Sequence, residues 1–192
     1  MFEYKSESEY KKKLPGILEA DFHIESNVKV HWPLGGKEKE VDFLLQPKAH
    51  LIKNGFDAMS FAIEVKSPIA NESVKKLLDC IIQAYTYSLC QYRGVHPAFV
   101  LIYPDIEKFF EYDFAYKYKK DPRNRFNASE IIILRRLMQR ANVGELIVDG
   151  NDYEINFAAA YYYSSKKGRS GIKNLGITRR VGSKKVRLKL MV

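Results

Sequence analysis

Two opposite charges lie inside an apolar segment of this chain, FAIEVKSPIA (61–70). Its apolar residues and the proline that follows them predict a β-strand. Side chains alternate between the two faces of a strand, so Glu64 and Lys66 point to the same face. A salt-bridged pair on a solvated face would explain an isolated Glu-x-Lys. A chemical site requires further groups nearby.

A second carboxylate, Asp42, lies in the preceding apolar segment, EVDFLLQ (40–46). If the two segments are neighbouring strands, Asp42 and Glu64 can come close on one face. Buried carboxylates repel each other and lose solvation, so they need a cation, and Lys66 supplies one positive charge against two negative ones. A hard divalent ion that prefers oxygen ligands, such as Mg²⁺, would compensate the remaining charge. The residue types therefore predict a metal site with a lysine beside it.

Six elements are expected to position these residues. The patterns predict a helix at 6–20, strands at 27–32, 40–46 and 60–67, a helix at 72–92 and a strand at 98–103. Pro15 and Gly16 interrupt the first helix, which can therefore form two short pieces. The three consecutive strands can form a meander, and the second helix then crosses over so that the last strand joins in parallel. The predicted fold class is α/β, with helices packed on one mixed sheet.

The rest of the chain adds a stretch of aromatic and basic residues at 109–126, a helix at 129–141, a β-hairpin at 144–158 and a basic strand near 186–192. The aromatic and basic stretch either stacks bases and binds phosphates or forms a packed helix with snorkelling lysines. We expect residues 1–163 to form one domain and residues 164–192 to be a basic C-terminal extension packed on it.

Together, Asp42, a spacer of 21 residues and the triplet Glu64-Val65-Lys66 resemble the D…(D/E)-x-K motif of the PD-(D/E)XK nuclease superfamily. The common core of that superfamily, the restriction-endonuclease-like fold, has the order αβββαβ predicted above. One departure is Val41, which stands where the family name places a proline.

The resemblance covers about residues 6–103 and implies a set of roles. Asp42, Glu64 and the carbonyl of Val65 would bind Mg²⁺, for which Mn²⁺ could substitute. Lys66 would orient or help to deprotonate the attacking water and would stabilise the charge that develops on the phosphate. The implied reaction is hydrolysis of phosphodiester bonds in DNA.

Two further positions fit branches of the same superfamily. Gln83 and Tyr87 have the Q-x-x-x-Y spacing of exonuclease-like and recombination-nuclease members and lie one helical turn apart. On a helical wheel, however, Gln83 lies roughly opposite the apolar stripe, so an ordinary solvated face is the alternative. That stripe comprises Val74, Leu77, Leu78, Ile81, Tyr85 and Leu89.

Many members also carry a glutamate on the first helix, and Glu19 and Glu9 are the candidates here. We prefer Glu19 as a catalytic residue because it lies at the end of the helix nearer the first strand. Glu9 is otherwise explained as a favourable charge at a helix N-terminus.

The net charge of +9 is unevenly distributed. Residues 164–192 contain ten Lys or Arg and no acidic residue, whereas residues 1–163 contain 22 basic and 23 acidic residues. Such a basic segment favours a polyanionic partner, here DNA, although an anionic membrane surface or a solubility tail would have the same charge. The expected nucleic-acid contacts are Lys184, Lys185, Arg187 and Lys189.

Other properties limit the function classes. No run reaches the roughly 18 apolar residues that span a bilayer, and no secretion signal is apparent, so we expect a cytoplasmic protein without a membrane partner. Cys80 and Cys90, predicted in one helix, would lie too far apart to form a disulfide. The alternatives to a deoxyribonuclease are a catalytically lapsed nucleic-acid-binding protein and an RNA-processing endonuclease. A homodimer is among the assembly states that remain open.

Overall fold

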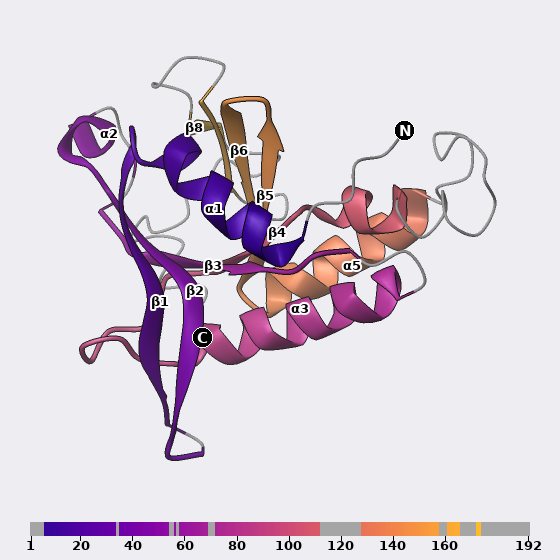
Figure 1. Cartoon of the computed structure of the whole chain (residues 1–192), viewed down its shortest axis with the longest axis horizontal. Coiled ribbons are helices and arrows are strands. Elements are labelled where there is room, and N and C mark those ends of the chain that lie inside the picture. The colour runs from indigo at the N-terminus through magenta and orange to yellow at the C-terminus, as the bar shows by residue number, and fades with distance from the viewer. Residues whose placement is uncertain are drawn as a thin grey trace.

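A mixed β-sheet with helices on both faces forms the described part of the chain (Figure 1). The computed structural model describes residues 6–33, 35–53, 56, 58–68, 72–111, 128–157, 161–165 and 172–173. The helices are α1 (Glu7–Leu18), α2 (Ala49–Lys53), α3 (Ser73–Ser88) and α5 (Ala128–Arg140), and residues 106–111 are also helical. The strands are β1 (Phe22–Trp32), β2 (Lys37–Pro47), β3 (Phe61–Val65), β4 (Val100–Tyr103), β5 (Val143–Asp149), β6 (Asp152–Phe157), β7 (Tyr161–Ser164) and β8 (Ile172–Lys173).

The eight strands in the described residues lie in the sheet in the order in which they occur along the chain. The β1–β2 and β2–β3 pairs are antiparallel, the β3–β4 and β4–β5 pairs are parallel, and the remaining pairs are antiparallel. This confirms the predicted α/β class, the meander, the crossover through α3 and the hairpin, now β5–β6. The short helix α2, inserted between β2 and β3, was not predicted.

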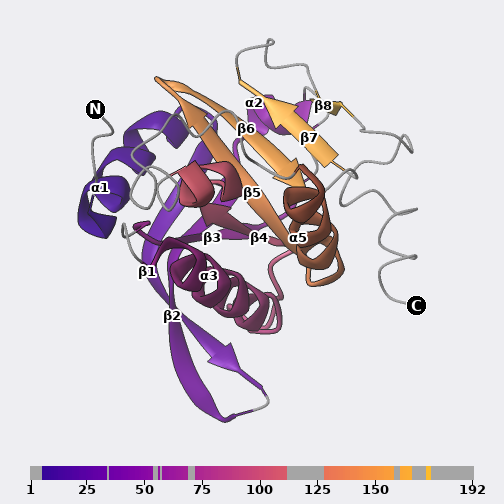
Figure 2. The same cartoon turned by 90° about the vertical axis from the view of Figure 1, so that its right-hand side faces the viewer.

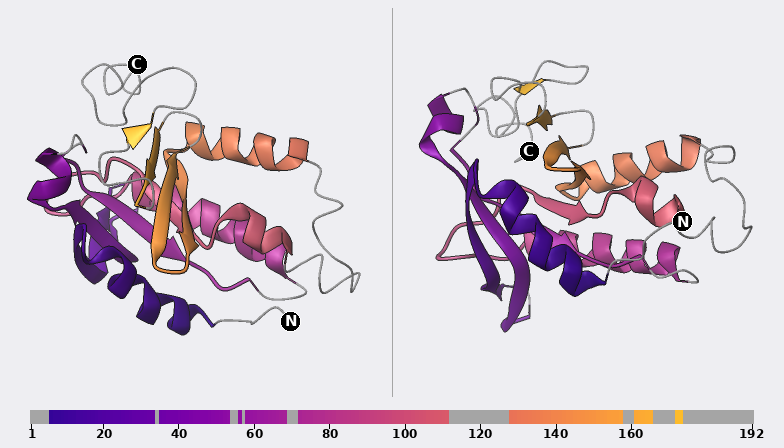
Figure 3. Two further views of the ribbon diagram at one scale, coloured as in Figure 1. Left: turned by 90° about the horizontal axis from the view of Figure 1, so that it is seen from above. Right: turned by 45° about the horizontal axis from the view of Figure 1, so that its top comes forward.

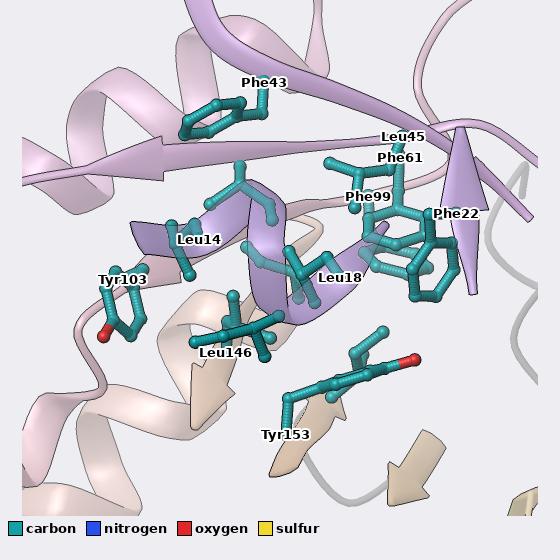
Figure 4. Packing of buried hydrophobic residues seen from close by; sticks show 14 of the residues in the cluster. Leu14, Leu18, Phe22, Phe43, Leu45, Phe61, Phe99, Tyr103, Leu146 and Tyr153 are labelled. Atoms are coloured by element: carbon teal, nitrogen blue, oxygen red, sulfur yellow. The ribbon is translucent and has the colours of Figure 1, made fainter. Parts of the chain in front are cut away.

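Each face of the sheet carries its own hydrophobic core. On one face, α1 packs Leu14 and Leu18 against Phe61 and Leu146, and the rings of Phe61 and Phe99 stack with centroids 4.9 Å apart (Figure 4). On the other face, α3 and α5 cover β3, β4 and β5 (Figures 2 and 3). In the described residues, no helix is both long enough and apolar enough to cross a membrane.

One continuous helix, α1, runs through Pro15 rather than forming the two short pieces considered from the sequence. Its N-terminus is a capping box: the backbone N–H of Glu9 donates to the Ser6 hydroxyl, and the N–H of Ser6 donates to the Glu9 carboxylate. This arrangement satisfies two N–H groups that the first turn cannot pair internally. The cap fixes the first turn, which carries Glu7 and leads into Lys11.

The β1–β2 hairpin changes direction halfway along its length. Phe22 and Ile24 pack on the α1 side of the sheet, but Val28 and Val30 pack on the α3 side, although even spacing in a flat strand would keep all four on one face. Between them, Asn27 has a left-handed φ of 52°, a conformation that asparagine tolerates better than most residues. Beyond this bend the hairpin continues past the end of β3 (Figure 1).

The sequence predicted the buried face of α3 only in part: Leu77 is buried and Ile81 packs against the core as expected. Three residues of the expected apolar stripe, Val74, Leu78 and Tyr85, are exposed. The face that packs on the sheet instead consists of Ser73, Leu77, Cys80, Ala84, Tyr87 and Ser88. Small side chains on this face let the helix approach the strands closely.

Some predictions fall outside the described residues. They include the basic strand with Lys184, Lys185, Arg187 and Lys189, and most of the aromatic and basic stretch at 109–126. Within the 164–192 extension, the short strand β8 pairs antiparallel with β7. Cys80 lies in α3, and Cys90 lies just beyond its end; both are free and buried.

Candidate active site

Asp42 lies where β2 separates from β3. The β2–β3 ladder pairs Phe43 with Ile63, and continuing the same register places Asp42 opposite Glu64. The backbone N–H of Val65 donates to Oδ2 of Asp42 over 2.8 Å, so the aspartate is fixed against the end of β3. The register therefore places the two predicted carboxylates opposite each other, near the end of β3 and midway along β2.

Lys66 follows directly on β3. Its backbone N–H donates to the carbonyl of Tyr103 over 2.9 Å, which extends the parallel β3–β4 pairing by one residue. Its Nζ lies 3.2 Å from Oε1 of Glu64 and 3.9 Å from Oε2 of Glu7. Its side chain keeps 20% of its surface exposed, whereas that of Glu64 keeps 3%. The lysine thus connects a buried carboxylate to the surface.

The helix α1 contributes two residues that the sequence analysis missed. Nζ of Lys11 lies 2.6 Å from Oδ1 of Asp42 and 2.8 Å from Oε1 of Glu7. The pair has the i, i+4 spacing of an ordinary stabilising ion pair on a helix, so its sequence pattern gives no sign of a site. What distinguishes Lys11 is its second partner, Asp42, which comes from the sheet.

The structure does not bring the preferred glutamate, Glu19, to this cluster. Glu19 is the C-cap of α1, and the chain enters β1 at Phe22, which pairs with Pro47 at the end of β2, five residues along the strand from Asp42. The other candidate, Glu9, belongs to the capping box. Among the glutamates of α1, the structure places Glu7 at the site.

Burial and neighbouring charges shift the pKa values of the charged groups in this cluster. Burial and the nearby charge of Asp42 together raise the pKa of Glu64 to about 7, because Lys66 only partly offsets these two effects. Burial alone would lower the pKa of Lys66, but Glu64 outweighs burial and raises it. Lys11 behaves similarly, because Asp42 and Glu7 raise its pKa above the ordinary value despite burial. Both lysines therefore stay charged at neutral pH, while Glu64 is only partly ionised.

The helix α3 closes the other side of the cluster. The thiol of Cys80 lies 3.9 Å from the carbonyl oxygen of Glu64, and burial followed by the charge of Glu64 raises the pKa of that thiol. Burial also raises the pKa of Tyr87, with further contributions from Glu64 and Asp42. Tyr87 is therefore close enough to the carboxylates to respond to their charge.

Gln83 lies between Cys80 and Tyr87 on α3. It is three residues after Cys80 and four before Tyr87, the spacings at which side chains are neighbours on a helix surface. Its Oε1 is buried and has no hydrogen-bond partner among the described residues. A buried acceptor without a donor is uncommon and needs an explanation. The face of α3 that packs on the sheet differs from the apolar stripe predicted from the sequence. Gln83 therefore lies beside the buried face, whereas it lies opposite the predicted stripe.

The donor set fits a hard divalent cation. In a strand, the N–H and C=O of one residue point to the same side, so the Val65 carbonyl lies on the side of its N–H, which faces Asp42. Within the described ranges, no group of three or more His, Cys, Asp or Glu side chains is arranged to hold a metal ion. Mg²⁺, however, commonly binds through one or two carboxylates and keeps several waters, and Asp42, Glu64 and the Val65 carbonyl supply such a set.

Comparison with known proteins gives no match: no protein-family model, curated protein or solved structure is significantly similar to this chain. Any functional assignment therefore depends on the chemistry of the cluster itself.

Proposed function

We propose that this protein is a metal-dependent nuclease that hydrolyses phosphodiester bonds in DNA. The observation that carries the proposal is the convergence of Asp42, Glu64 and Lys66 at the point where β2 leaves β3. Apart from the short helix α2 between β2 and β3, the element order α1, β1, β2, β3, α3, β4 is the αβββαβ order of a restriction-endonuclease-like core and supports that fold.

The charge balance of the cluster supports a cation and an anionic substrate. Three carboxylates, Glu7, Asp42 and Glu64, face two ammonium groups, Lys11 and Lys66, so fully ionised they leave one negative charge in excess. A bound divalent ion would change that excess to one positive charge. One phosphodiester group, with its single negative charge, would then neutralise the site.

In this proposal, Asp42, Glu64 and the Val65 carbonyl hold Mg²⁺, or Mn²⁺ in its place. When bound, the metal supplies hydroxide near neutral pH and offsets charge on the scissile phosphate. Lys66 holds the attacking water or a phosphate oxygen through its partly exposed ammonium. Gln83 offers its unpaired amide oxygen to a water or a substrate donor at the same site.

The test is a cleavage assay on linear duplex, circular duplex, single-stranded DNA and RNA, with Mg²⁺, with Mn²⁺ and with EDTA. We expect cleavage of DNA that requires the metal, and a loss of at least about a thousandfold in Glu64→Gln, Asp42→Asn and Lys66→Met. Asp79→Asn is the matched control, because Asp79 is an exposed carboxylate on α3.

Two results would contradict the proposal. One is the absence of metal-dependent cleavage of every substrate by the parent chain. The other is a parent-like rate in Glu64→Gln. Cleavage of RNA alone would replace DNA as the substrate and leave the assignment of the residues in place.

A further inference from the structure

In the part of the chain that the structure describes, both carboxylate oxygens of the predicted metal ligand Asp42 have donors, whereas one oxygen of Glu64 does. Its Oδ2 accepts the N–H of Val65 over 2.8 Å, and its Oδ1 lies 2.6 Å from the ammonium of Lys11. The second distance is short for a pair of this kind, as expected of a charge-assisted hydrogen bond. Only 11% of the Asp42 side chain is exposed, so water competes little for these oxygens.

Lys11 holds its carboxylates more tightly than Lys66 holds its own. Lys11 lies 2.6 Å from Asp42 and 2.8 Å from Glu7, whereas Lys66 lies 3.2 Å from Glu64 and 3.9 Å from Glu7. The tighter ammonium therefore occupies the predicted metal ligand Asp42. Glu7 contacts both lysines and connects the two halves of the cluster.

A metal ion and Lys11 cannot both bind Oδ1 of Asp42 in this arrangement without strong repulsion. Mg²⁺ binds carboxylate oxygens at about 2.0–2.1 Å. An ammonium 2.6 Å from the same oxygen would lie within a few ångström of the ion. Like charges at that separation in a partly buried site repel strongly.

We infer that Lys11 is an internal cation that neutralises Asp42 before metal binds, and that a divalent ion displaces it from Asp42. This inference rests on the proposed function and names a regulatory feature of the same site. Glu7 retains the displaced ammonium through the i, i+4 pair on α1. The exchange weakens metal binding and so raises the metal concentration at which the site fills.

The first test measures Mn²⁺ affinity by isothermal titration calorimetry for the full chain and for Lys11→Met. We expect Lys11→Met to bind Mn²⁺ about tenfold more tightly. In the parent chain, Mn²⁺ binding breaks the charge-assisted hydrogen bond between Lys11 and Asp42, whereas the variant has no such bond to break. Lys12→Met is the matched control, because Lys12 is the next lysine on α1 and is exposed. Equal affinities in Lys11→Met and the parent would overturn the inference.

The second test uses the unmodified chain and does not depend on the folding of a variant. Lysines are acylated briefly with acetic anhydride, with and without saturating Mn²⁺, and the rate at Lys11 is measured by mass spectrometry relative to Lys12. We expect Mn²⁺ to raise the relative rate at Lys11 several-fold, because displacement releases its ammonium from Asp42. An unchanged relative rate at saturating Mn²⁺ would contradict displacement.

Failure of this inference can be told apart from failure of the proposed function. Mn²⁺ binding that is absent from the parent, or is the same in the parent and Glu64→Gln, overturns both. Mn²⁺ binding and cleavage that depend on Glu64, with unchanged affinity in Lys11→Met, overturn only the displacement of Lys11.

Discussion

Two buried glutamates lie at the same level on either side of β4, and their surroundings differ. Glu64 of β3 and Glu145 of β5 both pair in register with Ile102, and only 2% and 1% of their surfaces are exposed. Arg135 holds Glu145 through two bonds, from Nε to Oε2 over 2.6 Å and from Nη2 to Oε1 over 3.2 Å. The N–H of Ile106 adds a third donor over 3.1 Å.

Among the described residues, Glu64 has no such set of donors. One ammonium lies 3.2 Å from one of its oxygens, and Asp42 adds a second negative charge beside it. The guanidinium of Arg135 fits a carboxylate in a fixed planar geometry, whereas the ammonium of Lys66 is a single point charge. Burial alone therefore does not identify a site, because Glu145 is buried and compensated whereas Glu64 is buried and only partly compensated by Lys66.

A raised pKa is also insufficient as a sign of function. Burial and the charge of Glu145 raise the pKa of Asp105 to about 6. Asp105, however, accepts the N–H of Lys108 over 3.3 Å at the start of the helical residues 106–111, which is a capping role. The Glu64 carboxylate differs because its partner at 3.2 Å is the side-chain ammonium of Lys66 rather than a backbone N–H at the start of a helix.

The largest expected effect comes from making the same substitution on both sides of β4. Glu145→Gln should lower the free energy of unfolding by about 3 kcal/mol at pH 7, because it removes the more buried of the two carboxylates that compensate the partly buried Arg135. Glu64→Gln should change it by less than about 1 kcal/mol, because the lost carboxylate was poorly compensated. Urea unfolding in EDTA measures both. Equal losses of unfolding free energy in the two variants would contradict the proposed difference between a compensated Glu145 and a poorly compensated Glu64.

The next largest effect is the pH dependence of the free energy of unfolding, to which Glu64 and Asp105 contribute in different pH ranges. A carboxyl whose pKa is higher in the folded than in the unfolded chain stabilises the fold at low pH, and this contribution is lost as pH rises through the folded value. With pKa values of about 7 for Glu64 and about 6 for Asp105, Glu64 should dominate the loss between pH 6 and 7. We expect that loss to be about 1 kcal/mol.

Urea unfolding at pH 6 and pH 7 in EDTA tests this assignment. Most of the loss should disappear in Glu64→Gln, and most of it should persist in Asp105→Asn. If Glu64→Gln retains the whole loss, another group titrates in this range, and the contrast between the two sides of β4 no longer depends on Glu64.

The smallest effect concerns Gln83, whose buried oxygen is unpaired. Gln83→Leu should leave the free energy of unfolding unchanged or raise it by up to about 1 kcal/mol, because it removes a buried acceptor without a donor. In the proposed nuclease it should also slow cleavage about tenfold, the equivalent of one hydrogen bond. Gln91→Leu is the matched control, because the Gln91 amide is paired with His96 over 3.1 Å and should lose stability without losing activity. A marked loss of stability in Gln83→Leu would indicate a structural role.

Much of the core could be predicted because local patterns determine it. Apolar runs ended by Pro or Gly gave the order of helices and strands, and a meander of three strands brings the second and third side by side. Asp42 and Glu64 could therefore be expected to meet. The register that places them opposite each other could not, because it is set across the connection from residue 48 to residue 60, which contains α2.

The missed features depend on packing between elements. Counting large apolar residues favoured Val74 and Leu78 for the buried face of α3, whereas close approach to the sheet requires small ones such as Cys80 and Ala84. The choice of Glu19 followed from predicting the first strand to start at residue 27. The strand in fact begins at Phe22, and this short connection holds Glu19 near Pro47 at the end of β2, five residues along the strand from Asp42.

The sequential order of the strands has a consequence for how the chain folds. Every ladder in the described sheet joins strands that follow one another along the chain. The antiparallel ladders close shorter connections, whereas the parallel β3–β4 and β4–β5 ladders close the longer connections 66–99 and 104–142. The five charged residues of the candidate site, Glu7, Lys11, Asp42, Glu64 and Lys66, fall within the first 66 residues, and those of the Glu145 cluster fall between residues 105 and 145. During synthesis the sheet can therefore grow one strand at a time, with the carboxylates of the site paired to their lysines before the second cluster leaves the ribosome.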